Sequence, residues 1–186
     1  MNRRRFLVSA ATTGLAAAGG PWIASSTAAS DDELAFANFG IAGELLLGDF
    51  YAKALSLRDL EKPTRLVLRS GKASADRHAK TLGELLVGAG QTAPERDDFA
   101  FVWPKKAFAS LDAARSTGLT VIRPLLGAYQ TALASISEQS YRVLYASLAA
   151  SLGQQAGALA GVAAVEPFPV ATDLESASAA LEGYLG

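Results

Sequence analysis

The sequence contains no cysteine, and this absence alone removes several kinds of chemistry. Without a thiol the chain can form no disulfide, no thiolate zinc site, no iron–sulfur cluster and no cysteine nucleophile. There is a single histidine, His78, and no Gly-x-Ser-x-Gly motif, which together argue against a serine hydrolase triad. The glycine fingerprint of dinucleotide-binding proteins is also missing. The stability of the fold must therefore come from packing.

A surplus of basic residues is lacking too, and this bears on the kind of partner. The chain has 17 Lys and Arg against 18 Asp and Glu, and three of the arginines lie within residues 1–29, which contain no acid. The remaining chain is acidic, so we expect no binding to nucleic acid. One basic group recurs at helical spacing with polar neighbours, which predicts a solvated helix face rather than an anion site. It comprises Arg65, Arg69, Lys72, Arg77 and Lys80.

Residues 1–29 have the order of features found in an export signal. Arg3, Arg4 and Arg5 come first, a mildly apolar stretch follows, and the last residues are small. The start resembles the twin-arginine translocation motif, with an ordinary secretory signal as the alternative. The apolar stretch is shorter than the roughly 20 residues that span a bilayer, so we expect cleavage between Ala28 and Ser30 and no stable membrane anchor afterwards. We predict export through the twin-arginine (Tat) translocase to the periplasm, cell envelope or extracellular space.

Signals for β-strands are absent from the rest of the chain. Its β-branched residues do not alternate with polar ones, and there is no Asn-Gly or Asp-Gly hairpin motif. Abundant Ala and Leu at helical spacing predict one all-α domain over residues 30–186. We predict long helices at about 30–56, 63–87, 119–136 and 138–162, short helices at about 105–115 and from 172, and an extended aromatic crossover at 91–105. Residues 116–118 should interrupt the helical structure before the third long helix, and Pro124 should kink that helix.

Glu44 is the one acid inside an apolar run of the first predicted helix. At about 100° per residue, Asn38, Asp49 and Lys53 form a narrow polar stripe, and Glu44 lies nearly opposite. A carboxylate on the core side of a helix costs roughly several kcal/mol unless it is paired, protonated or bound to a metal. His78 lies on the apolar seam of the second predicted helix and is the natural companion.

This pattern resembles the ferritin-like superfamily, in particular its exported, desiccation-related members. In the first helix, Glu44 precedes Phe50-Tyr51 by six residues. The second helix has residues 75–78 in the place of Glu-x-x-His, followed by a leucine-rich turn, glycines and an aromatic segment, and the third has Ala128-Tyr129. The resemblance implies a four-helix bundle with a long crossover between helices 2 and 3 and a short C-terminal helix. It also implies an inward-facing dimetal site of four carboxylates and two histidines.

The sequence departs from that ligand set. Ala75 occupies the place of the second-helix glutamate, and Asp76 beside it points about 100° away. The third helix has apolar residues at 121–122 and no acid, and the fourth offers only the amides of Gln154 and Gln155. Neutral amides are poor ligands for iron.

Glu44 and His78 therefore remain as the candidate metal ligands, and two ligands rarely hold a transition metal. The favoured interpretation is a buried Glu–His hydrogen bond, inherited from a metal site and completed by Gln154, Gln155 or a tyrosine. Arg123 could neutralise Glu44 from across the bundle or extend into solvent.

We therefore expect an exported ferritin-like bundle with a degenerate dimetal site, no cofactor, and a non-catalytic structural or binding role in the cell envelope. One alternative is a metal-binding protein with a reduced site that holds iron or manganese, in iron handling or in protection from oxidants and desiccation. Another is a module that forms a homodimer or holds an envelope protein through small residues of the fourth helix. These are Ala150, Gly153, Gly157 and Gly161.

Overall fold

The computed structural model describes residues 30–160 and 169–186, and over these residues the protein is helical. The predicted export signal lies outside the described residues. The helices are α1 (Asp31–Leu55), α2 (Lys62–Gly88), the short 3-10 helix η2 (Arg96–Asp98), α3 (Leu111–Ser135), α4 (Gln139–Ala160) and α5 (Leu174–Glu182). Because no strand occurs in these ranges, the all-α prediction is confirmed. None of the described helices has the length and apolar character needed to cross a membrane.

Several helix ends lie where the local sequence predicts them. Ser30 caps α1: its hydroxyl accepts from the Glu33 amide at 3.3 Å, and the Glu33 carboxylate accepts from the Ser30 amide at 2.7 Å. α2 ends at Gly88, and Gly90 follows with a φ of 77°, which favours glycine. α5 begins after Asp173, whose carboxylate accepts from the Ser176 amide at 2.8 Å.

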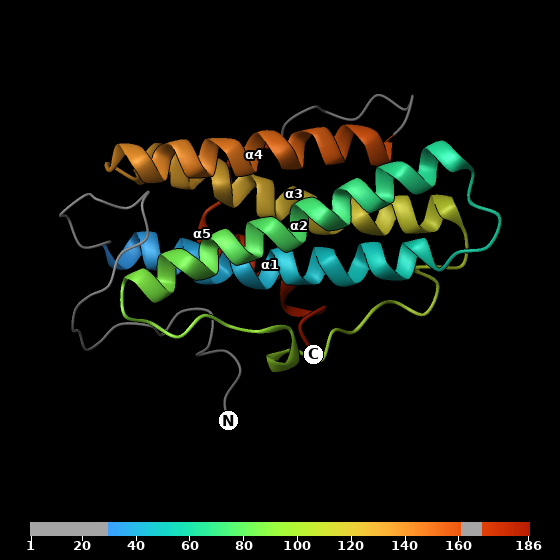
Figure 1. Cartoon of the computed structure of the whole chain (residues 1–186), viewed down its shortest axis with the longest axis horizontal. Coiled ribbons are helices and arrows are strands. Elements are labelled where there is room, and N and C mark those ends of the chain that lie inside the picture. The colour runs from blue at the N-terminus through green and yellow to red at the C-terminus, as the bar shows by residue number, and fades with distance from the viewer. Residues whose placement is uncertain (1–29, 161–168) are drawn as a thin grey trace.

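The long helices form a bundle of two pairs (Figure 1). α1 packs along α2, α3 packs along α4, and the pairs meet mainly through α1 and α3, while α5 lies against α3 and α1. The crossover between α2 and α3 runs along the bundle, so α3 starts at the end where α1 finishes. Residues 56–60 and 108–111 line a common hollow there.

The crossover is fixed to α1 through Asp49. The two oxygens of this carboxylate accept from Arg96 Nη2 at 2.8 Å and from Trp103 Nε1 at 2.7 Å. The Val102 amide donates to the Tyr184 carbonyl at 2.9 Å and so ties the crossover to the C-terminal residues. Apart from η2, the segment lacks helix up to residue 104, which agrees with the predicted extended crossover.

The prediction for residues 105–136 is wrong in one respect. There is no separate short helix at 105–115: residues 105–110 form turns and bends, and α3 is one helix that begins after the capping residue Ser110. Gly118 does not break it, because this glycine is buried in its interior, where a Cβ would lie 2.5 Å from Phe50 Cζ. Close packing, rather than a chain break, accounts for the glycine. Pro124 lies inside α3.

Two of the small residues of α4 lie on its exposed side, away from the core of the bundle. Ala150 and Gly157 are exposed, and a Cβ on Gly157 would have no described neighbour within 4 Å. Gly161 and the predicted end of this helix lie outside the described residues. α4 packs instead through a row of larger buried side chains. These are Tyr145, Leu148, Leu152, Gln155 and Leu159.

Candidate functional site

Glu44 lies in the middle of α1 and is fully buried, as the polar stripe on the opposite side of the helix predicts. Gly40, one turn earlier, leaves the space through which a neighbouring side chain reaches the carboxylate. A Cβ at Gly40 would lie 2.9 Å from the hydroxyl oxygen of Tyr129 on α3. The glycine therefore allows Tyr129 to come close to Glu44.

One oxygen of Glu44 receives both of its hydrogen-bond partners. His78 Nδ1, on α2, lies 3.1 Å from Glu44 Oε1, and the Tyr129 hydroxyl donates to the same oxygen at 3.2 Å. Glu44 Oε2 is buried and has no hydrogen-bond partner among the described residues. The His78 side chain is 13% exposed, so the imidazole links the buried carboxylate to the bundle surface.

The surroundings change the acidity of these groups. Burial raises the pKa of Glu44, and the hydrogen bond and charge of His78, followed by the hydrogen bond of Tyr129, act in the opposite direction with smaller effect. Burial also raises the pKa of Tyr129, and the nearby Glu44 carboxylate adds to this. Tyr129 is therefore a neutral donor, and Glu44 retains a proton more readily than a surface glutamate.

A second polar contact, between Tyr51 and Gln155, lies across the bundle between α1 and α4. The Tyr51 hydroxyl donates to Gln155 Oε1 at 2.7 Å, and its ring lies where a side chain at Gly71 would stand. The prediction that a glutamine forms a hydrogen bond with the Glu44–His78 pair is therefore wrong. Gln155 is hydrogen-bonded to Tyr51, and Gln154 is exposed. Of the partners that the sequence suggested besides His78, only a tyrosine is correct.

The neighbouring charged and aromatic residues have structural roles. Arg123 is exposed on α3, so it extends into solvent instead of neutralising Glu44. Tyr145 is buried, its ring centroid lies 5.6 Å from that of Tyr129, and its hydroxyl donates to the Glu33 carbonyl at 3.4 Å. These contacts give Tyr145 a packing role in the core.

The residues present do not fit a dimetal centre. Ala75 is fully buried at the place of the second-helix ligand, and Asp76 forms an ion pair with Lys72 at 2.7 Å on the surface. Val121 and Ile122 of α3 are fully buried and offer no ligand atom. Within residues 30–160 and 169–186, no group of three or more His, Asp or Glu side chains is placed to hold an ion.

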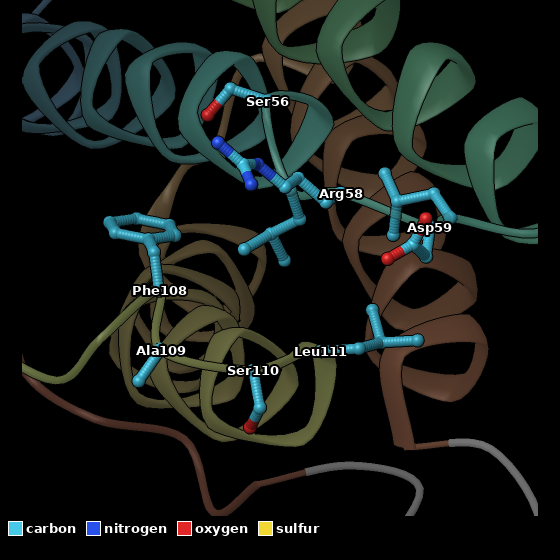
Figure 2. A pocket seen from close by; sticks show the side chains of 9 residues that line it. Ser56, Arg58, Asp59, Phe108, Ala109, Ser110 and Leu111 are labelled. Carbon is cyan, nitrogen blue, oxygen red and sulfur yellow. The ribbon is translucent and has the colours of Figure 1, made fainter.

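The hollow at the end of the bundle does not supply a second reactive site. Its volume is about 440 Å³, and the α1–α2 loop and the residues before α3 line it (Figure 2). Its charged side chains, Arg58 and Asp59, are exposed, and Ser110 is engaged as the cap of α3. No buried titratable group faces it.

No protein-family model, curated protein or solved structure matches the chain. The chemistry of the site thus follows from its own geometry. Sequence reasoning located Glu44 and His78, but it did not assign Tyr129 to Glu44 or pair Tyr51 with Gln155. The Ala128-Tyr129 pair and the glycine at position 40 were the available signals.

Proposed function

We propose that the chain is an exported ferritin-like bundle protein whose dimetal centre has been lost, with a non-catalytic structural or binding role in the cell envelope. The pairing of α1 with α2 and of α3 with α4, joined by a crossover along the bundle, supports the ferritin-like assignment. The order of features in residues 1–29 supports export.

The main support for a lost centre is the state of Glu44. His78 and Tyr129 satisfy one carboxylate oxygen from within the protein, and burial favours the protonated acid. From α3 this carboxylate receives the phenol of Tyr129, and no third acid or histidine among the described residues joins Glu44 and His78 to hold an ion. The arrangement is that of a carboxylate that remains from an ancestral metal site and is now hydrogen-bonded within the protein.

Metal analysis of the protein recovered from the cell envelope tests the loss of the centre. We expect iron and manganese well below one ion per chain, and the same content in Glu44→Gln and His78→Gln variants. Stoichiometric metal in the wild type that disappears in both variants would overturn the proposal.

A second candidate, a reduced metal site, has one specific observation in its favour. Glu44 Oε2 is buried without a hydrogen-bond partner, and the 3.1 Å between Glu44 Oε1 and His78 Nδ1 is within reach of a single ion with ligand bonds of about 2.0–2.6 Å. Such a site would hold iron or manganese for iron handling or protection from oxidants. Equilibrium dialysis against manganese distinguishes it: micromolar binding lost in Glu44→Gln would support this candidate.

Export is tested separately by replacing Arg3 and Arg4 with lysine. The twin-arginine pathway should then leave the protein in the cytoplasm, whereas an ordinary secretory signal should tolerate the change because it needs only positive charge. Cell fractionation with immunodetection measures the distribution, and the Arg5→Lys variant serves as a control with the same chemical change. Unchanged export of the double variant would contradict the twin-arginine route.

A further inference from the structure

The beginning of α2 presents two exposed aliphatic side chains close to several cations along the chain. Leu66 is 56% exposed and Val67 is 39% exposed, although both are large apolar residues. Basic residues precede, flank and follow them on the chain. We call this region the α2-start surface; it consists of Arg58, Lys62, Arg65, Leu66, Val67 and Arg69.

The cations of the α2-start surface differ from those further along the same helix. Lys72 is paired with Asp76 at 2.7 Å, and Lys80 lies 3.8 Å from Glu84. None of the four cations of the α2-start surface forms an ion pair with another described residue. Their charge is therefore available to an external anion.

This surface is also a basic region in an otherwise acidic chain. Residues 58–69 contain four Lys and Arg and two acids, although acids outnumber Lys and Arg in the whole sequence. A molecule with this asymmetry meets a negatively charged surface with its basic end first. Leu66 follows Lys62 by four residues and precedes Arg69 by three within α2, so it lies on the same side of the helix and reaches the contact as well.

We propose that the α2-start surface docks on a membrane surface that contains anionic lipids. The cations contact lipid phosphates, and Leu66 and Val67 enter the boundary between headgroups and acyl chains. A soluble polyanion would satisfy the cations but offer no apolar layer to the two aliphatic side chains. With so few apolar residues the docking is reversible and sensitive to salt. It does not depend on the state of the Glu44 site.

Vesicle co-sedimentation of the full chain tests this surface, with residues 1–29 the same in every variant. We expect binding to vesicles of phosphatidylcholine mixed with phosphatidylglycerol, much weaker binding to phosphatidylcholine alone, and loss of binding in about 0.5 M salt. Lys62→Gln/Arg69→Gln should weaken binding to the anionic vesicles by roughly tenfold or more. The control Lys80→Gln/Arg142→Gln removes the same charge from other exposed positions and should change binding by less than about threefold.

The apolar contribution is tested with Leu66→Ser, which keeps the charge. This variant should bind the anionic vesicles roughly fivefold or more weakly, while its circular dichroism spectrum and melting temperature stay those of the wild type. Equal weakening by the two double variants would overturn the proposal, because only net charge would then matter. Unchanged binding of Leu66→Ser, together with equally tight binding to soluble polyphosphate, would also overturn it and indicate an anionic partner without an apolar layer.

Discussion

The two helix pairs contribute differently to the polar centre of the bundle. The α1–α2 pair supplies the ionisable groups Glu44 and His78, which lie 3.1 Å apart. The α3–α4 pair supplies neutral groups, the Tyr129 hydroxyl that donates to Glu44 and the Gln155 amide oxygen that accepts from Tyr51, while Val121 and Ile122 are fully buried. A dimetal centre needs carboxylates from both sides of a bundle, so a one-sided set can form a hydrogen-bonded pair but not such a centre. The absence of a carboxylate from the α3–α4 pair beside Glu44 therefore separates this site from a dimetal centre.

The largest effect should come from removing packing contributed by α3 to α1. Leu125 is fully buried, and its side chain lies 2.7 Å from where a Cβ on Gly43 would be, next to Glu44. Leu125→Ala should lower the free energy of unfolding by about 2–5 kcal/mol. Urea denaturation measures it, and the exposed Leu66→Ala is the control, with an expected change within about 0.5 kcal/mol. Similar losses in the two variants would show that Leu125 does not join the pairs.

A smaller loss should follow from adding one methyl group to α2. Tyr51 occupies the space beside Gly71, so in Gly71→Ala the ring must move and the bond from Tyr51 to Gln155 weakens. We expect a loss of about 1–3 kcal/mol. The matched control is Gly157→Ala inside α4, where a Cβ meets no described atom within 4 Å.

The control should go in the opposite direction. Alanine is favoured over glycine in a helix interior by about 0.5–1 kcal/mol, so Gly157→Ala should stabilise the protein slightly in thermal unfolding. Destabilisation by Gly157→Ala would indicate that another molecule packs on this part of α4. That result would support dimerisation through α4.

The most subtle test concerns the proton on Glu44. Burial raises its pKa above the ordinary 4.5, so the folded protein binds this proton more tightly than the unfolded chain. The stability that Glu44 contributes is full below about pH 4.5 and is lost as pH rises through the pKa of the folded state. Relative to Glu44→Gln, the wild type should therefore lose free energy of unfolding as pH rises from 4.5 to 7.5.

Urea denaturation at several pH values measures that difference. Repeating the series in a His78→Gln background removes the contribution of the histidine from the comparison. A wild type that gains free energy of unfolding relative to Glu44→Gln as pH rises would mean that the folded state stabilises the ionised carboxylate, contrary to the direction that burial imposes.

Much of α1 and α2 could be predicted because their signals are local. Ser30 and Glu33 have capping-box spacing, and three polar residues on one side of α1 suffice to place Glu44 in the core. His78 follows from the same periodicity on α2. The meeting of these side chains was a reasonable expectation, since consecutive antiparallel helices pack together in a bundle.

The errors arose where distant residues decide the outcome. By local rules Gly118 predicts a break in the helix. It nevertheless lies within α3, where the Phe50 side chain of α1 occupies the space that a Cβ would need. The partner of Gln155 could not be deduced either, because Tyr51 lies 104 positions away in the sequence. Helix propensity is a weak guide when tertiary contacts favour a particular residue.

The attachment of the crossover by Trp103 gives the protein a built-in optical probe. The chain has two tryptophans, and the other, Trp22, belongs to the segment that we expect to be removed on export. The Trp103 indole is bonded to Asp49, and its ring centroid lies 5.4 Å from that of Phe108 and 5.3 Å from that of Tyr184. Emission from the mature protein would therefore report one segment, while circular dichroism reports the helices. Comparing the two transitions would reveal whether the crossover detaches before the bundle melts.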